Sequence, residues 1–398
     1  MSRHPPDSSQ LPRVVISVRG AQRLREGHVW VYRSDIVSDG SATPGALVEI
    51  VDGRGKTLGT ALYSSASQIA IRFLSRERVD DLEKLVRQRI CQAVAYRERV
   101  VHDTDAYRVV FSEADFLPGL IVDRYNDIVS FQVLTQGMDS GPARKALVSE
   151  LSEQLHPEAI AERVDPKIRE LERLPARSSG LVHGDKSTTV FSMNGVKFHY
   201  DALLGQKTGA FLDQRENYAA TAQYARGEAL DVCCYQGGFA LHLAKSCSRV
   251  TGVDSSRPAL EVADRNAELN GKEIEWIEAN AFDLLRDYAA AGQQYDTVIL
   301  DPPAFAKSKR DLDTALRGYK ELNLRALKML RPGGILATCS CSYHVSQADF
   351  LQVVAEAACD VHKSLRILES RPQAKDHPIL LNVPETAYLK CLIMHVTL

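Results

Sequence analysis

The feature that most constrains the fold of this chain is the regular alternation of strand-like and helix-like segments from about residue 191 onward. Segments such as 229–235 (ALDVCCY), 249–254 (RVTGVD) and 296–303 (DTVILDPP) carry the apolar and β-branched residues of buried strands, and helical patterns separate them. Such alternation builds a doubly wound α/β sheet, because each connection between parallel strands has to cross one face of the sheet. A ligand of this fold binds outside the carboxyl ends of the strands.

The N-terminal half has a different pattern, which predicts two further units ahead of the α/β domain. Short β-rich runs between Gly, Pro and Asp turn signals predict a small β-barrel of five or six strands at 13–78. Residues 79–190 predict a connecting amphipathic helix at 79–102, followed by a small α+β module. The α/β domain is then expected at 191–398. The first twelve residues are rich in Pro and Ser, which predicts disorder there.

Composition is typical of a globular protein that folds in water, with 44% hydrophobic and 25% charged residues. No apolar run reaches the roughly 18 residues that span a bilayer, and the N-terminus lacks the apolar core of a signal peptide. These features predict a cytoplasmic location and no contact with membranes. The eight cysteines are expected to be reduced thiols. Because no CxxC pair recurs, we expect no metal.

Side chains that suit a nucleotide follow four successive strands of the predicted α/β domain. The first strand holds Asp231 and leads into a turn whose backbone N–H groups become available to a ligand. The second strand ends at Asp254, a carboxylate that can accept both hydroxyl groups of a ribose. The third strand leads to an apolar wall with one polar edge for an adenine, and Asp-Pro-Pro follows the fourth. The predicted cofactor residues here are Asp231, Tyr235, Gly237, Asp254, Asn280, Ala281, Phe282 and Asp301.

Two alternative roles for these strand ends stay open. Asp254 could serve only to cap the helix that follows it, through Ser255 and Ser256. The fold could also hold a nicotinamide cofactor, as in a dehydrogenase. That class prefers a GxGxxG turn, whereas this chain has Gly237-Gly238, and it has no evident use for Asp-Pro-Pro followed by a strand that bears cysteines.

The constellation of strand ends resembles the motifs of class I S-adenosylmethionine-dependent methyltransferases, whose catalytic domain is Rossmann-like. The block at 206–217 (QKTGAFLDQREN) resembles the QKTGFFLDQR signature of the ribosomal RNA large subunit methyltransferase I family. The resemblance implies S-adenosylmethionine as the cofactor. It also implies that this block contributes cofactor or loop-ordering contacts through Lys207, Phe211, Asp213 and Arg215. Alternatively, Phe211 belongs to the core and Arg215 is a structural ion-pair partner.

The same resemblance extends over most of the chain. The stretch 27–36 (GHVWVYRSDI) looks like the PUA domain of that family, and 117–125 (LPGLIVDRY) looks like its central module. The segments 301–309 (DPPAFAKSK) and 340–342 (SCS) are similar to its catalytic loops. The resemblance implies that the β-barrel is PUA-like and that the partner is 23S ribosomal RNA, naked or partly assembled into the large subunit.

The fifth predicted strand places two cysteines at its end, Cys339 and Cys341. They share one face if the strand continues that far. C5 of cytosine is a poor nucleophile, and a thiolate that adds to C6 converts C5 into an enamine carbon able to take a methyl group. Cys341 is the predicted nucleophile because it is the cysteine of the SCS triplet in the resemblance, and Cys339 is the alternative. Asp301 is predicted to bind the cytosine edge and to stabilise the protonated ring.

One departure from the pattern concerns the base that removes the C5 proton. Many RNA cytosine-5 methyltransferases carry a second cysteine directly after the fourth-strand proline, where this chain has Ala304. Another base must then act, and Asp301 acting through a water molecule is one candidate.

Basic residues gather after the Asp-Pro-Pro segment. Between residues 302 and 331 eight basic residues stand against three acidic ones, so this stretch is a candidate phosphate-facing strip or, alternatively, a solvated helix face. Phe305 is placed to stack on a base that has left its helix. The RNA-binding residues predicted in and after the Asp-Pro-Pro segment are Pro302, Phe305, Lys307 and Lys309. In the barrel we predict Arg23, together with Arg19, Arg25 and Arg33.

Other functions remain open on the sequence alone. A methyltransferase of the same fold that acts on N7 of guanine or N6 of adenine needs no thiol. A non-catalytic RNA-binding adaptor is the second alternative. The sequence does not identify the modified cytosine or the oligomeric state, for which a homodimer is one option.

Overall fold

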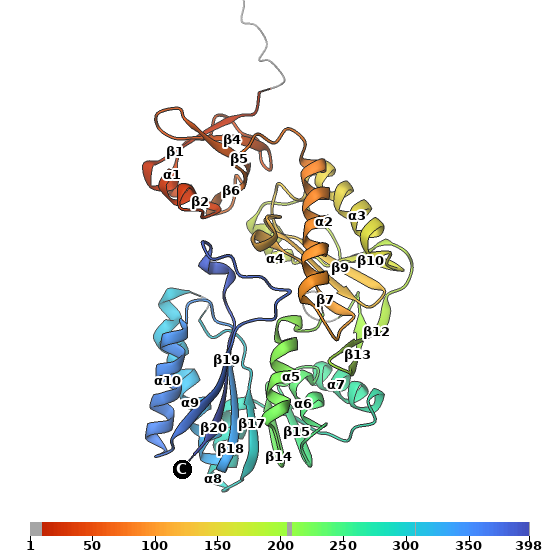
Figure 1. Cartoon of the computed structure of the whole chain (residues 1–398), viewed down its shortest axis with the longest axis vertical. Coiled ribbons are helices and arrows are strands. Elements are labelled where there is room, and N and C mark those ends of the chain that lie inside the picture. The colour runs from red at the N-terminus through yellow and green to blue at the C-terminus, as the bar shows by residue number, and fades with distance from the viewer. Residues whose placement is uncertain (1–9, 205–208, 307, 398) are drawn as a thin grey trace, which may run out of the picture.

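The computed structural model of this chain describes residues 10–204, 209–306 and 308–397. Its strands form four sheets, of six, five, two and seven strands. The six-stranded sheet lies at one end of the long axis, the seven-stranded sheet at the other, and the five-stranded sheet between them (Figure 1). The disorder expected at the N-terminus falls mostly on residues outside this description.

The N-terminal sheet is built from short strands around a small apolar core. In spatial order its strands are β2 (Trp30–Tyr32), β6 (Ile69–Ser75), β5 (Thr57–Tyr63), β4 (Leu47–Val51), β1 (Arg13–Ile16) and β3 (Ile36–Ser38). Six strands agree with the five or six that the turn signals predict. The core between them is aliphatic and fully buried, with Val14, Ile16, Val48, Ile50 and Ile71 at its centre. Helix α1 (Val18–Arg25), capped by Ser17, was not predicted.

A long helix and a mixed sheet follow. Helix α2 (Leu82–Val100) confirms the amphipathic helix expected at 79–102. The sheet has the order β11 (Gly180–His183), β10 (Ala159–Glu162), β9 (Ile128–Val133), β8 (Leu120–Tyr125) and β7 (Ala106–Phe111), with helices α3 (Gly141–Leu155) and α4 (Pro166–Leu171) between strands. Apolar side chains of α2 and α3 pack together against β7–β10. This mixed sheet with its helices is the small α+β module expected after the connecting helix.

A two-stranded hairpin joins this unit to the C-terminal one. Its strands are β12 (Thr188–Met193) and β13 (Val196–Asp201). Tyr200 of the hairpin stacks on Tyr125 of β8 at 3.9 Å between ring centroids, while Phe198 packs near His242 of the C-terminal unit. The hairpin therefore belongs to both cores. The boundary expected between residues 190 and 191 falls inside β12, and the limits 13–78, 79–190 and 191–398 stay predictions.

The C-terminal sheet carries the predicted α/β alternation. Its spatial order is β16 (Glu275–Glu278), β15 (Arg249–Asp254), β14 (Glu228–Val232), β17 (Tyr295–Leu300), β18 (Leu330–Ser340), β20 (Lys390–Val396) and β19 (Leu365–Arg371). The first five of these are parallel. Strand β20 runs antiparallel to both of its neighbours, so the sheet is mixed at this edge and not wholly parallel as expected.

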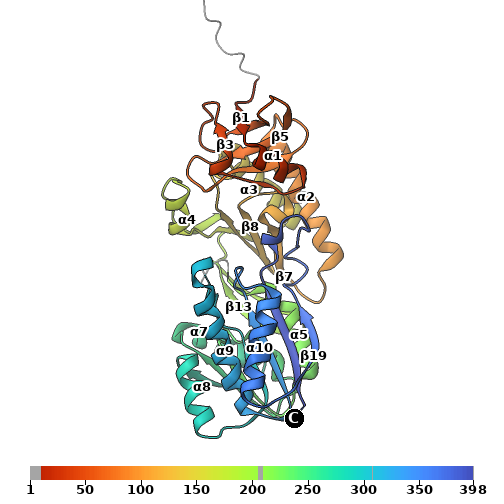
Figure 2. The same ribbon diagram turned by 90° about the vertical axis from the view of Figure 1, so that its left-hand side faces the viewer.

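Helices cover both faces of this sheet (Figure 2). Helices α5 (Arg215–Tyr224), α6 (Gly238–Leu243) and α7 (Arg257–Leu269) contribute to one core, and α8 (Ala281–Ala290), α9 (Leu312–Met329) and α10 (Gln347–Asp360) to the other. The strand order reverses between β14 and β17, and a doubly wound sheet opens a crevice at the carboxyl ends of the strands at such a point. Within the part of the chain that is described, no helix is long and apolar enough to cross a membrane.

Candidate active site

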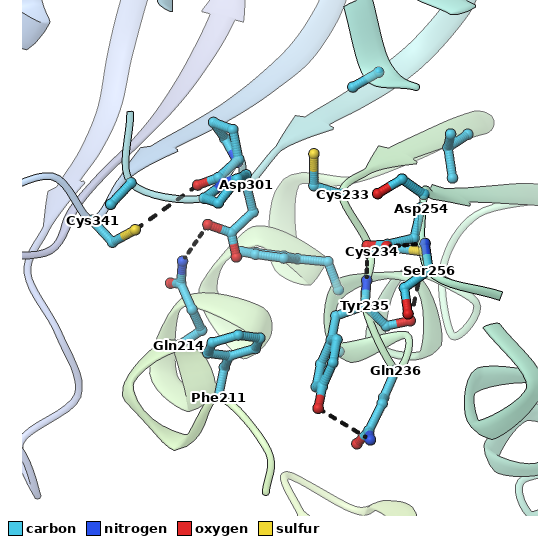
Figure 3. A pocket seen from close by; sticks show the side chains of 18 of the residues that line it. Phe211, Gln214, Cys233, Cys234, Tyr235, Gln236, Asp254, Ser256, Asp301 and Cys341 are labelled. Atoms are coloured by element: carbon cyan, nitrogen blue, oxygen red, sulfur yellow. Dashed lines mark hydrogen bonds between the residues drawn. The ribbon is translucent and has the colours of Figure 1, made fainter. Parts of the chain in front are cut away.

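A cavity of about 520 Å³ lies at the carboxyl ends of the parallel strands (Figure 3). Residues that follow β14, β15, β16, β17 and β18 line it, together with part of the 210–214 segment. We call it the first cavity. It lies at the edge of the sheet where the strand pattern places a ligand.

Asp254 ends β15 at the wall of the first cavity. Its Oδ2 accepts a hydrogen bond from the backbone N of Tyr235 and its Oδ1 one from the backbone N of Ser256, both at 2.9 Å. Ser256 itself caps α7 through its hydroxyl. Asp254 thus helps to organise the start of the helix, in line with the capping alternative, and it also presents a carboxylate to the cavity. A carboxylate oxygen has lone pairs left for a second donor, so a ribose hydroxyl could still bind.

Residues after β16 form a second part of this wall. Asn280 caps α8, since its Oδ1 accepts from the backbone N of Phe282 at 2.9 Å. That leaves the side-chain amide N–H groups of Asn280 for a partner in the cavity. Phe282 lines the cavity with 38% of its surface exposed, and its ring lies 5.9 Å from that of Phe305. Together with Ala281 these residues make an apolar surface with one polar edge.

The loop between β14 and α6 has an unusual backbone. Cys233 and Tyr235 have φ of 66° and 50°, and Gly237 has φ of 84°. A left-handed conformation costs a non-glycine residue on the order of 1–3 kcal/mol, and residues of this kind cluster at ligand sites. A Cβ on Gly237 would come within 2.9 Å of the Trp276 ring. Cys233 and Tyr235 line the cavity, whereas Gly237 shapes the turn and is absent from the wall.

Asp231 lies behind this loop, in β14, with none of its surface exposed. Its Oδ2 accepts from the backbone N of Ala240 at 2.8 Å, and its Oδ1 has no hydrogen-bond partner among the described residues. Burial raises the pKa of Asp231 to about 8, with the charge of Asp301 as a smaller cause. Asp231 does not line the first cavity, and its carboxyl group holds the β14–α6 turn from behind.

The described part of the signature block, residues 209–217, contributes to the wall of the first cavity. Phe211 and Asp213 line the cavity, the ring of Phe211 meets that of Tyr235 edge-on at 4.9 Å, and Asp213 Oδ2 accepts from Tyr388 Oη at 2.6 Å. Lys207 lies outside the described residues. Arg215 is buried and does not line the cavity, since its guanidinium donates to Asp376 at 2.9 Å. Its position matches the ion-pair alternative and not direct contact with a ligand in this cavity.

The two cysteines of β18 have different surroundings. The strand ends at Ser340, so Cys341 lies beyond it and the two thiols do not share a strand face. Cys339 is fully buried opposite Cys391, and burial raises its pKa well above the usual value. Cys341 is partly exposed and lines the first cavity, where its Sγ lies 3.9 Å from the carbonyl oxygen of Pro302 (Figure 3).

Two ionisable groups flank Cys341. Asp301 lines the same cavity and accepts from Gln214 Nε2 at 3.0 Å. Burial, with the charge of Asp213, raises the pKa of Asp301 to about 7. On the other side, Lys390 is only 7% exposed and donates to the carbonyl oxygens of Ser342 at 2.7 Å and Tyr388 at 2.9 Å. Burial lowers the pKa of Lys390 to about 8, and Cys341 opposes this shift.

The predicted RNA-binding residues are not all at the first cavity. Pro302 and Phe305 line it, and Phe305 packs 4.8 Å from Tyr319. Lys309 is not among the residues that line this cavity, and Lys307 is outside the described residues. Arg23 lies in the N-terminal unit, where it pairs with Asp35 at 3.2 Å.

Much of the basic charge expected to face phosphates is already paired. Arg19 also binds Asp35, and Arg25 binds Asp52. Within the strip after Asp-Pro-Pro, acidic side chains pair with Lys320, Arg325 and Arg331. This strip therefore has fewer unpaired positive charges than its excess of basic over acidic residues suggests.

Three residues of this site were not predicted from the sequence: Gln214, Tyr388 and Lys390. Gln214 lies inside the 206–217 block, but it carries no charge that would mark it. Tyr388 and Lys390 come from the end of the chain, after a loop at 372–389 that has no periodic pattern. Only the tertiary structure brings that loop to the carboxyl ends of β17 and β18.

Family comparisons match both ends of the chain. Residues 14–76 match the model of a PUA-like domain, and residues 174–395 match that of an S-adenosylmethionine-dependent methyltransferase. A Ribosomal RNA large subunit methyltransferase I from Tolumonas auensis is 40% identical over 386 residues, covering 93% of this chain and 96% of that protein. The protein of the same name from Shewanella amazonensis is 38% identical, covering 94% and 96%.

The chain belongs to the ribosomal RNA large subunit methyltransferase I family. This confirms the predicted fold class, with a PUA-like domain ahead of a Rossmann-like class I methyltransferase domain, and S-adenosylmethionine as the cofactor. A crystal structure described as that of a candidate methyltransferase complexed with SAH superposes with a TM-score of 0.83 at 17% identity, covering 96% of this chain and 99% of that one. A candidate SAM-dependent methyltransferase from Streptococcus mutans gives 0.81, again at 17% identity and with 96% and 99% covered. Both share the fold over nearly the full length.

The residues of the first cavity fit this cofactor of the methyltransferase I family. Asp254 offers a carboxylate for ribose hydroxyls, and Asn280 and Phe282 offer a polar edge and an apolar wall for an adenine. Asp231, which is predicted to contact the cofactor, is buried behind the β14–α6 turn and does not line the cavity. Among the described residues, no cluster of three or more His, Cys, Asp or Glu side chains could hold a metal ion.

Proposed function

We propose that this enzyme forms 5-methylcytosine in 23S ribosomal RNA through a covalent bond between Cys341 Sγ and C6 of the base. The observation that carries the proposal is the position of Cys341 in the wall of the cofactor cavity, beside Asp301 and Pro302. Cys339, the alternative nucleophile, is buried against Cys391 and does not line this cavity. The relatives named Ribosomal RNA large subunit methyltransferase I support ribosomal RNA as the substrate.

The reaction begins at the thiol. Cys341 loses its proton to solvent, and the thiolate forms a bond to C6 of the cytosine. Asp301, whose pKa near 7 keeps a large fraction protonated at neutral pH, donates a proton to N3 as the ring electrons move. C5 is now an enamine carbon. When bound, S-adenosylmethionine would supply an electrophilic methyl group; C5 would take this group as the methyl–sulfur bond breaks, and S-adenosylhomocysteine would be the leaving group.

Release of the product needs a base. After the transfer, C5 carries both a methyl group and a proton. The Asp301 carboxylate, ionised by its earlier donation, accepts the C5 proton through a water molecule. The electron pair of that C–H bond restores the C5–C6 double bond and expels the Cys341 thiolate, and N3 then loses its proton to solvent. This route gives Asp301 the role that a second cysteine plays in many RNA cytosine-5 methyltransferases, where this chain has Ala304.

Base stacking completes the proposed site. A base must leave its stack for a thiolate and a methyl donor to reach C6 and C5. Phe305, held against Tyr319 and facing the cavity, can receive the ring that swings in. Pro302 forms the neighbouring wall. The PUA-like domain supports an RNA partner, and the cytoplasmic location expected from the sequence stays a prediction.

The test of this function is the mass spectrometry of ribosomal RNA. Nucleosides from 23S RNA of a strain that lacks the gene should miss one 5-methylcytidine, and the wild-type gene should restore it. A gene encoding Cys341→Ala should not. The appearance of N7-methylguanosine or N6-methyladenosine in place of 5-methylcytidine would replace the proposal with one of the alternatives. If the 23S RNA of all strains contained the same methylated nucleosides, the result would support an RNA-binding adaptor without catalytic activity.

A further inference from the structure

A second cavity, also of about 520 Å³, adjoins the first. Its wall comes from the start of η4 (Lys309–Asp311), the segment 343–347 after the SCS triplet, the end of β19 and the end of the 372–389 loop. Leu389 lines both cavities, so only one side chain separates them at that point. No part of the proposed methyl transfer uses this second cavity.

The wall of the second cavity is basic. Lys309, His344, Arg371 and Lys390 line it, and no Asp or Glu is among the described residues of the wall. Arg371 is neutralised by Glu369, and Lys390 is buried against backbone carbonyls. Lys309 is exposed and forms no ion pair within the described part of the chain. An unneutralised ammonium group at the rim of a cavity without carboxylates suits an anion such as a phosphate.

An aromatic side chain lies beside this charge. Tyr343 lines the second cavity with 45% of its surface exposed, and its ring meets that of His344 at 5.2 Å. An exposed aromatic ring is a platform on which an unstacked base can bind. A phosphate-binding ammonium and a stacking ring in one cavity together match a nucleotide.

We infer that the second cavity binds the nucleotide next to the target base, with Lys309 on its phosphate and Tyr343 against its base. The inference rests on the proposed function. When the target base enters the first cavity, the next nucleotide of the RNA lies beside Leu389, which lines both cavities. The 372–389 loop lies between the N-terminal and C-terminal units (Figure 1), and His28 of the N-terminal unit pairs with its Glu385 at 3.1 Å. RNA in the second cavity is therefore close to the PUA-like domain.

The experiment uses the full-length enzyme and a 23S ribosomal RNA transcript made without modifications. Lys309→Ala should raise KM for the transcript and leave the affinity for S-adenosylmethionine unchanged. Loss of one phosphate contact should also reduce the slope of log affinity against log salt by about 0.7, the value for a single strand. Lys272→Ala is the matched control, because Lys272 precedes β16 at the amino ends of the parallel strands, whereas both cavities open at their carboxyl ends. It should alter neither quantity.

The aromatic half of the inference has its own pair of variants. Tyr343→Ala should weaken transcript binding about tenfold, as expected for the loss of one base stack, and Tyr343→Phe should retain the wild-type affinity. Unchanged KM and unchanged salt slope in Lys309→Ala, together with unchanged binding in Tyr343→Ala, would overturn the inference. If the wild-type enzyme methylates the transcript at a guanine or adenine, the proposed cytosine chemistry fails, whereas the binding measurements still decide the role of the second cavity.

Discussion

Cys341 owes its position in the first cavity to the residue at which β18 ends. A strand that continued to residue 341 would alternate its side chains and turn both cysteines to one face. The structure ends β18 at Ser340, and Cys341 turns into the cavity while Cys339 stays in the core. Sequence alone could place two thiols after the fifth strand, but their separation depends on that end point.

Lys390 is the positive charge best placed to support a thiolate at Cys341. It lies opposite Ser340 in the register between β18 and β20, and its Nζ binds the carbonyl of Ser342, so it brackets the cysteine. The other ionisable groups around the thiol are Asp301 and Tyr319. A nearby ammonium favours the thiolate, and the thiolate is the reactive form.

Replacement of this lysine should therefore slow the chemistry of the thiol. We expect Lys390→Met to reduce the rate of iodoacetamide alkylation at Cys341, mapped by mass spectrometry, about tenfold at pH 7. Because burial lowers the pKa of Lys390 to about 8, the wild-type enzyme should hold this advantage below pH 8 and lose it above. Lys390→Arg should recover much of the rate. Equal alkylation rates in Lys390→Met and wild type at pH 7 would show that Lys390 only fills space.

At the scale of elements, the 372–389 loop ties three parts of the molecule together. Asp376 in this loop accepts from the Arg215 guanidinium and from the backbone N of Arg108 in β7. Burial alone would raise the pKa of Asp376, but His377 and Arg215 outweigh burial and hold it well below the usual range. The carboxylate thus stays charged in the interior and links α5, β7 and the loop.

Removal of the Arg215 guanidinium should leave the buried Asp376 carboxylate without its arginine partner and so lower the free energy of unfolding. We expect Arg215→Met to destabilise the protein by about 3 kcal/mol, near the lower end for breaking a buried ion pair because His377 remains. Thermal unfolding without cofactor measures the loss. The double variant Arg215→Met/Asp376→Asn should recover part of it, since no charge is then left unpaired. An unchanged unfolding temperature with weaker S-adenosylmethionine binding would instead make Arg215 a cofactor contact, as the sequence motif implies.

The sequence predicted those helices and strands that are determined by residues close to one another in the chain. The strands that carry Asp231 and Asp254, and the strand that precedes Asp301, are rich in apolar and β-branched residues. Asn280 begins a helix by a capping interaction that its residue type favours. The hairpin β12–β13 and the antiparallel strand β20 were not predicted. Their packing partners lie far away in sequence, as with Tyr200 on Tyr125 and Lys390 beside Ser340.

At the scale of the whole molecule, residues near 210 and residues near 389 come together in one cavity of the C-terminal unit. The PUA-like domain makes its own contacts with the central unit. Ser64 and Arg72 of the N-terminal unit both bind Glu172, and Trp30 Nε1 donates to Glu113 at 3.0 Å. Buried polar contacts of this kind fix the orientation of neighbouring units. The catalytic and RNA-binding parts therefore act on one substrate from defined positions.

The proposed bond between Cys341 Sγ and C6 of a cytosine can be trapped with 5-fluorocytidine in the substrate RNA. Fluorine at C5 cannot leave as a proton, so the covalent RNA adduct should accumulate and survive a denaturing gel. We expect this adduct with wild-type enzyme and with Cys339→Ala, and its absence with Cys341→Ala. An adduct that persists in Cys341→Ala and disappears in Cys339→Ala would contradict the assignment, as would the absence of any adduct from wild-type enzyme that methylates the same transcript at another base.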